Sequence, residues 1–168
     1  VAILAPYNAG KIAGVSEEQI CRSIALSHLL NAYVKAFTGS LAPVCGCAIG
    51  AGVGACAAIV YQTKGADIKA ITLAINNLVS DIGGMLCDGA KSGCALKVVS
   101  AADSAIRSAY MAIYGFGITD AEGFVGSTAE ATIQNLAKIS NTGMGKVDSA
   151  ILEIMRGKAG ARAKRKSK

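Results

Sequence analysis

Apolar residues recur along most of the chain at the three- and four-residue spacing of a helix, and no stretch alternates apolar and polar positions long enough to indicate a sheet. The clearest case is residues 16–37. Its apolar positions are Ile20, Ile24, Leu26, Leu30 and Val34. Ser16 and Gln19 have the spacing of a capping box at its start, and Gly39 marks its end. The pattern predicts an all-α fold, a compact bundle of about six helices.

Five further segments have helical character. They are residues 43–62, 66–84, 91–115, 127–140 and 145–157. Ser127 and Glu130 form a second predicted capping box. Asn76 and Asn77 are polar positions in an otherwise apolar segment, and they face either a site or solvent.

Residues 36–63 contain no charged side chain. A bilayer span needs roughly 20 apolar residues, and this stretch is long enough. Its many glycines, its few large apolar side chains and Pro43 argue against that interpretation, and a soluble helix buried on all sides has the same composition. The glycines of "GAGVGA" also lack the strand and the third-glycine spacing of a dinucleotide-binding loop. We therefore expect no membrane span, and predict a central glycine-rich buried helix whose glycines let neighbouring helices approach.

The positive charge is confined to one end of the chain. Of the 17 Lys and Arg residues, seven lie from Arg156 onward with no acid among them, which leaves 10 basic against 11 acidic residues before that point. We predict a helical domain over 1–156 and a basic, disordered tail over 157–168. No aromatic residue is interleaved in the tail to stack on bases, so we expect no specific nucleic-acid partner.

Six cysteines in a chain without a recognisable secretory signal favour reduced thiols and a cytoplasmic location over a disulfide framework. Cys45 and Cys47 lie at the start of one predicted helix, and Cys87 and Cys94 lie at the start of another. Helix starts stabilise thiolates through unpaired N–H groups and the helix dipole. Four thiols there would hold zinc, and three would hold an iron–sulfur cluster with one iron left open. The alternative is four small buried side chains.

The remaining two cysteines and three other side chains complete the candidates. Cys21 and Cys56 fall within apolar helix and are interpreted as core. His28, the only histidine, is either a catalytic base or, as we favour, a buried hydrogen-bonded side chain. Asp88 and Lys91 lie between Cys87 and Cys94 and would orient substrate or balance cluster charge; Asp88 is equally suited to capping the next helix.

Two long stretches, "ALSHLLNAYVKAFTGSLAPVCGCAIGAGVGACAAIVY" and "AINNLVSDIGGMLCDGAKSGCALKVVSAADSA", resemble the C-terminal part of the L-cysteine desulfidase family, a relative of the alpha chain of iron–sulfur L-serine dehydratase. The resemblance runs from about residue 3 to residue 155. It implies an all-helical fold around a 4Fe–4S cluster held by three cysteines. The matching positions are Cys87, Cys94 and one of Cys45 or Cys47, and the sequence does not choose between those two.

The implied reaction is β-elimination from a small amino acid. L-cysteine would give pyruvate, ammonia and sulfide, and L-serine would lose water in the same way. Family members are more than twice this length and carry a further catalytic cysteine in an N-terminal part, so the resemblance also implies a missing N-terminal half or partner subunit. We further expect a homo-oligomer. The alternative function is a non-catalytic helical module that binds metal structurally or binds a partner.

Overall fold

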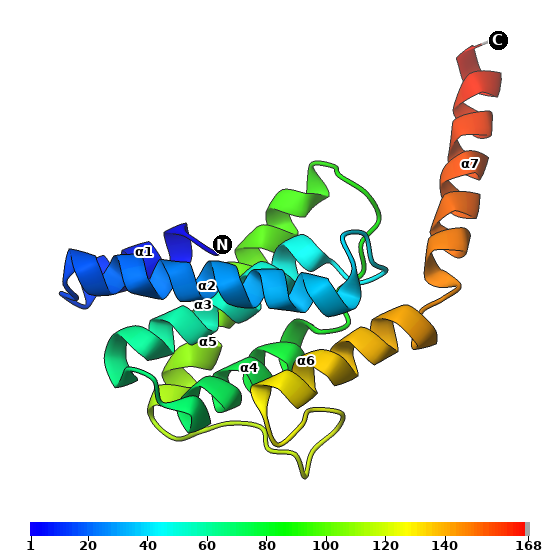
Figure 1. Cartoon of the computed structure of the whole chain (residues 1–168). Coiled ribbons are helices and arrows are strands. Elements are labelled where there is room, and N and C mark those ends of the chain that lie inside the picture. The colour runs from blue at the N-terminus through cyan, green and yellow to red at the C-terminus, as the bar shows by residue number, and fades with distance from the viewer. Residues whose placement is uncertain (167–168) are drawn as a thin grey trace.

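The chain folds as a helical bundle with one helix at its centre. The computed structural model describes the backbone of residues 1–166 and the side chains of residues 1–159 (Figure 1). Its helices are α1 (Leu4–Ile12), α2 (Glu17–Thr38), α3 (Gly46–Lys64), α4 (Ile68–Ile82), α5 (Gly93–Ile113), α6 (Ala129–Lys138), a π-helical turn (Ile139–Gly143) and α7 (Val147–Lys166). Within the described residues there is no strand beyond one isolated bridge. The predicted all-α bundle is confirmed.

Helix α3 is the buried centre of this bundle. It packs against α1, α2, α4 and α5, and twelve of its residues are buried. By length and composition alone α3 is apolar enough to cross a membrane, but 67% of its most apolar window is buried inside the fold, as in the core helix of a soluble protein. Residues 52–60 of α3 are all buried, which accounts for the absence of charge in that part of the stretch; the residues before α3 and both ends of the helix include exposed positions.

Glycines bring α2 and α3 into close contact, as the sequence predicts. A Cβ built on Gly54 would collide with the carbonyl oxygen of Ser27 and lie 2.7 Å from its hydroxyl. One turn earlier, a Cβ on Gly50 would lie 2.7 Å from Oδ1 of Asn31. Because these clashes involve the neighbouring helix, only a residue without a side chain lets the two helices approach this closely.

The helix starts match the sequence predictions in one case and differ in two. Ser16 caps α2, where its hydroxyl accepts the N–H of Gln19 at 3.3 Å. The cap of α6 is Thr128 rather than Ser127, since the Thr128 hydroxyl accepts the N–H of Ala131 at 3.1 Å. Helix α1 was not predicted, because Pro6 lies in its short span; a proline is tolerated in a first turn, where no intrahelical N–H bond is lost.

Asn76 and Asn77 face neither solvent nor a site. Both are buried on α4, and they bind the irregular segment between α5 and α6. The Asn76 amide donates to the carbonyl oxygens of Ile118 and Gly126, both at 3.1 Å. The Asn77 carbonyl accepts the N–H of Ile118 at 2.8 Å. These bonds satisfy backbone groups that have no helical partner, which explains two amides in an apolar segment.

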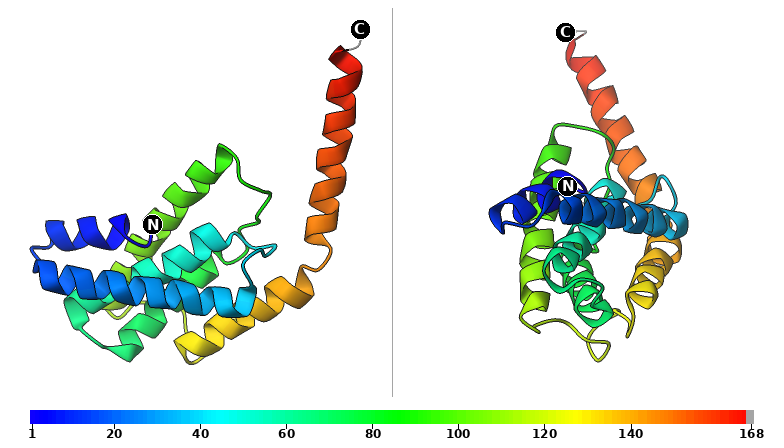
Figure 2. Two further views of the ribbon diagram at one scale, coloured as in Figure 1. Left: turned by 45° about the horizontal axis from the view of Figure 1, so that its top comes forward. Right: turned by 60° about the vertical axis from the view of Figure 1, so that its left-hand side comes forward.

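Helix α7 extends away from the other helices (Figure 2). It continues through Lys166 and so includes most of residues 157–168, for which the sequence predicts a disordered tail. The side chains from Gly160 onward, and residues 167–168 altogether, lie outside what the structure describes.

Candidate metal centre

Two loops that carry cysteines are joined at one end of the bundle. Val44 and Leu86 form an isolated antiparallel bridge. It is flanked by two backbone hydrogen bonds of 2.7 Å, from the N–H of Cys45 to the carbonyl of Met85 and from the N–H of Cys87 to the carbonyl of Pro43. In an antiparallel pair, alternate residues share a face, so Cys45 and Cys87 lie on the face opposite Val44 and Leu86. The fold thus brings together two thiols 42 positions apart in sequence.

Cys45 and Cys47 occupy different environments at the start of α3. Cys45 is the N-cap residue, is only 5% exposed and packs in a small apolar cluster that Cys87 also contacts. Cys47 lies in the first turn of α3 and is exposed. Cys87 is a neighbour of both candidates: it lines one pocket with Cys47 and packs against the apolar cluster of Cys45.

Cys94 lies in the first turn of α5 and is half-buried. Its thiol donates a hydrogen bond to the carbonyl oxygen of Gly89 at 3.4 Å, across the loop that joins it to Cys87. Gly89 has a φ of +88°, a backbone conformation that favours glycine. The loop therefore turns sharply directly after Asp88 and returns to α5.

Asp88 is held by two lysines. Its carboxylate pairs with Lys91 on one oxygen and with Lys97 on the other, the latter at 2.6 Å. Asp88 does not cap α5, whose N-cap residue is Ser92 with no side-chain cap bond, so that alternative is wrong. Lys97 was missed by the sequence reasoning. Its position three residues after Cys94, on the same face of a predicted helix, was the available signal.

A pocket of about 450 Å³ opens beside the two cysteine loops. Its polar lining comes from Lys35, Cys47, Cys87, Asp88 and Asp148, and the rest is largely apolar and includes residues of α7. This volume is within the usual range for small-molecule sites. The candidates Cys47, Cys87 and Asp88 therefore line the same pocket.

His28 is placed away from this pocket. It is exposed on α2 and does not line the pocket, so the favoured interpretation of a buried core histidine is wrong. Cys21 is exposed as well, against the expectation that it is core, because it falls on the outer side of α2. Cys56 is buried as expected, and burial raises the pKa of its thiol to about 12.

The donor set suits an iron–sulfur cluster in its chemistry. Thiolates are the ligands of such clusters. Cys45 and Cys47 lie at the start of α3, Cys94 lies at the start of α5, and Cys87 lies in the loop before α5. A Cβ built on Gly46 or Gly89 would meet no atom within 4 Å, so open space lies beside these backbones. Across the described residues no group of three His, Cys, Asp or Glu side chains is close enough to hold one ion. The ligand types and the open space fit a cluster, while the described side chains form no single-ion site.

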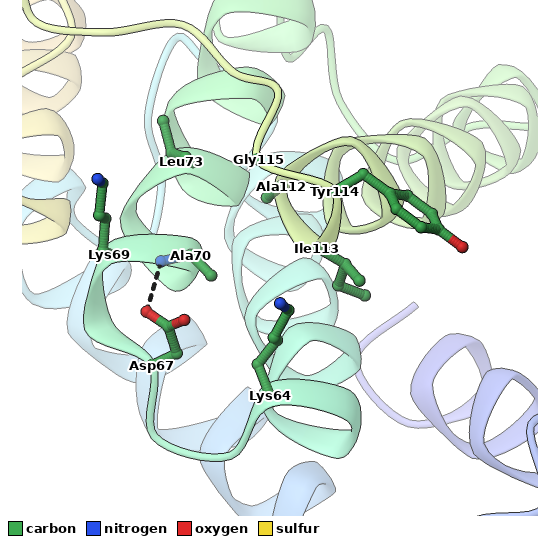
Figure 3. Close-up of a pocket in the computed structure, with 9 residues that line it drawn as sticks. All are labelled: Lys64, Asp67, Lys69, Ala70, Leu73, Ala112, Ile113, Tyr114 and Gly115. Carbon is green, nitrogen blue, oxygen red and sulfur yellow. Dashed lines mark hydrogen bonds between the residues drawn. The ribbon is translucent and has the colours of Figure 1, made fainter.

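A second pocket, of about 510 Å³, lies at the other end of α3 (Figure 3). Lys64 and Lys69 line it, and the Asp67 carboxylate accepts the N–H of Ala70 at 3.0 Å as the cap of α4. Tyr114 points away from the two lysines (Figure 3). With its one carboxylate used as a helix cap and no cysteine in its lining, this pocket offers no reactive group comparable to the cysteine end.

Comparison with known proteins gives one family. The family model of the serine dehydratase alpha chain matches residues 2–153. A UPF0597 protein of Elusimicrobium minutum is 69% identical over 94% of this chain, and one of Geobacter sulfurreducens is 64% identical over 92%. A UPF0597 protein of Clostridium tetani is 45% identical over 92% of the chain. The chain spans only 36% to 37% of the length of these relatives. No solved structure matches.

Proposed function

We propose that this chain, which belongs to the serine dehydratase alpha chain family, is the cluster-binding part of an iron–sulfur β-eliminating lyase. The observation that carries the proposal is the bridge between Val44 and Leu86, which joins two cysteine loops beside a pocket. Thiols scattered as core residues would need no such junction. The family match covers the whole of this arrangement.

The proposed ligands are Cys87, Cys94 and one of Cys45 or Cys47. Cys47 lines the open pocket, while Cys45 is nearly enclosed. A cluster ligand at Cys47 would therefore adjoin the pocket, and one at Cys45 would lie in the apolar interior. A bound cluster with an open iron would supply Lewis-acid chemistry to a leaving group. The starts of α3 and α5 place the positive ends of their dipoles beside Cys47 and Cys94, which would offset the negative charge of a bound cluster.

The side chains of the pocket would bind and orient a small amino acid. Lys35 offers a cation for the substrate carboxylate, and the apolar wall excludes water from the reacting carbon. Asp88 is fixed by two lysines and so serves orientation and charge balance rather than proton removal. Lys91 is engaged with Asp88 in the same way. His28 lies outside the pocket lining, so the base is assigned to the part of the protein beyond this region.

A complete active site would require that further part. The relatives carry nearly two thirds of their length outside the matched region, and an alpha chain implies a partner subunit. We propose L-cysteine as substrate, with release of pyruvate, ammonia and sulfide, or L-serine by the equivalent loss of water. The two substrates differ in the leaving group, a thiol in L-cysteine and a hydroxyl in L-serine.

A second candidate is a helical module that binds metal structurally or binds a partner without catalysis. Among the described side chains no three potential ligands converge on one point, which favours the partner-binding form of this module over its metal-binding form. The two candidates differ in the metal they predict. A lyase needs a labile cluster with an open iron, whereas a structural site is closed.

The test is anaerobic reconstitution with iron and sulfide, followed by absorbance and electron paramagnetic resonance. The proposal predicts an iron–sulfur chromophore, and a three-iron signal after mild oxidation because a cluster on three cysteines loses its unprotected iron. Cys87→Ala with Cys94→Ala should abolish both signals. Cys21→Ala is the matched control, an exposed cysteine away from the site, and should retain both.

Paired single variants separate the two remaining ligands. If Cys47 is the third ligand, Cys47→Ala loses the chromophore and Cys45→Ala keeps it, and the reverse holds for Cys45. Sulfide and pyruvate release from L-cysteine and L-serine is then measured with the rest of the protein supplied. Zinc uptake without a chromophore in the wild type would instead support the structural module.

A further inference from the structure

Lys97 contacts both residues that flank Cys87. Its ammonium group donates to the carbonyl oxygen of Leu86 at 2.6 Å and to the carboxylate of Asp88 at 2.6 Å. Leu86 immediately precedes Cys87 and Asp88 immediately follows it. The short segment that carries the Cys87 thiol is thus held on each side by a single cation.

Lys97 also lies next to Cys94. It follows Cys94 by three residues in α5, so the two side chains project from the same face of the helix, one turn apart. The loop between Cys87 and Cys94 contains four consecutive exposed residues, 89–92, and Gly89 has a positive φ. Because that loop has few buried contacts of its own, the bonds of Lys97 are a direct link between the segment of Cys87 and the helix turn of Cys94.

The contacts of Lys97 are less exposed to water than the contact of Lys91, the other lysine that pairs with Asp88. The Lys97 side chain is 22% exposed, whereas Lys91 is 47% exposed and contacts only the other oxygen of Asp88. A charge-assisted hydrogen bond strengthens as water is excluded from it. Of the two lysines, only Lys97 binds backbone as well as side chain, so only Lys97 constrains the main chain on both sides of the thiol.

We propose that Lys97 is a positioning residue for the Cys87 and Cys94 thiols. Lys97 lies one turn after Cys94 in α5 and binds both residues that flank Cys87, and these bonds set the separation of the two thiols. The role in cluster assembly rests on the proposed function; the positioning of Cys87 does not. Lys97 does not line the pocket, so it acts on a substrate only through the cysteines.

The experiment measures thiol alkylation in the cluster-free chain and cluster assembly in parallel. Wild type is compared with Lys97→Met, Lys97→Arg and Lys91→Met. Lys91→Met is the matched control, because it also removes one of the two lysines that pair with Asp88. Iodoacetamide alkylation is followed by mass spectrometry after cleavage before aspartate, which separates Cys87 from Cys94 in every variant because Asp88 lies between them. Circular dichroism confirms that each variant is folded.

Lys97→Met should raise the alkylation rate of Cys87 about five- to tenfold, the order expected when a charge-assisted bond to a local segment is lost. It should also reduce the iron bound per chain after reconstitution and weaken the three-iron signal. Lys97→Arg should restore both, since a guanidinium can donate to two oxygens at once. Lys91→Met should change the Cys87 rate by less than about twofold, as befits an exposed pair.

Equal Cys87 rates and equal cluster signals in Lys97→Met and Lys91→Met would overturn the proposal. So would a failure of Lys97→Arg to restore what Lys97→Met loses. If the wild type itself takes up no cluster, the proposed function fails, and the alkylation rates alone then decide for or against Lys97.

Discussion

Gly54→Ala tests whether the contact between α2 and α3 depends on the absence of a side chain. Gly54 is buried in the middle of α3. An added Cβ would collide with the carbonyl oxygen of Ser27, lie 2.7 Å from its hydroxyl and lie 2.9 Å from its carbonyl carbon. Two of these three atoms belong to the backbone of α2, so a rotamer change cannot relieve the clash. The helices must move apart, or α3 must bend.

The size of the effect follows from two opposing contributions. Overpacking of a well-packed interior destabilises by about 1–3 kcal/mol, and a clash with backbone falls at the upper end of that range. Alanine is favoured over glycine in a helix interior by about 1 kcal/mol, which offsets part of the loss. The net loss is about 2 kcal/mol, which in a chain of this size lowers Tm by roughly 4–8 °C.

Gly46→Ala is the matched control. It makes the same substitution in the first turn of the same helix, where a Cβ would meet no atom within 4 Å. It should leave the free energy of unfolding unchanged or raise it slightly. Urea and thermal unfolding of the cluster-free chain, followed by circular dichroism, measure both variants. If the unfolding free energies of Gly54→Ala and Gly46→Ala agree within about 0.5 kcal/mol, the argument from close helix approach is refuted.

Three further predictions test other parts of the fold. Asn77→Ala should lower the unfolding free energy by about 1–2 kcal/mol because it leaves partly buried backbone groups unpaired, and hydrogen exchange should quicken in the loop between α5 and α6. Cys56 has a folded pKa of about 12 against an ordinary value of 9.0, so folding favours its neutral thiol. The chain should therefore lose stability as pH rises from 9.0 towards 12. Cys56→Ala should flatten that part of the pH profile in denaturant titrations. Thr128→Ala should cost about 1 kcal/mol in thermal or urea unfolding, while Ser127→Ala changes little, because only the Thr128 hydroxyl caps α6.

Hydrophobic periodicity predicts the helices of this fold because the burial of apolar faces is what stabilises them. It identifies α3 as central, since a helix buried on all sides has no polar face to display. Periodicity does not predict the exposure of His28, because a lone histidine between apolar residues has no periodic signal of its own. The side chain lies on the outer side of α2. Asn76 and Asn77 were noticed, but their partners lie about 40 to 50 positions away, beyond the reach of any local pattern.

The candidate site shows the same division between local and long-range information. Local signals predict helix starts near the cysteines, and this is confirmed for Cys45, Cys47 and Cys94, whereas Cys87 lies in the loop before α5. Which thiols come together depends on the pairing of Val44 with Leu86, two apolar residues that carry no chemical signal. Cys45 adjoins this pairing and lies in an apolar cluster, whereas Cys47 lies in the first turn of α3 and lines the pocket, so two cysteines only two positions apart have different environments. The cysteine positions therefore indicate a candidate thiolate site and leave zinc and an iron–sulfur cluster open, while the geometry of that site depends on apolar and charged neighbours that the motif does not contain.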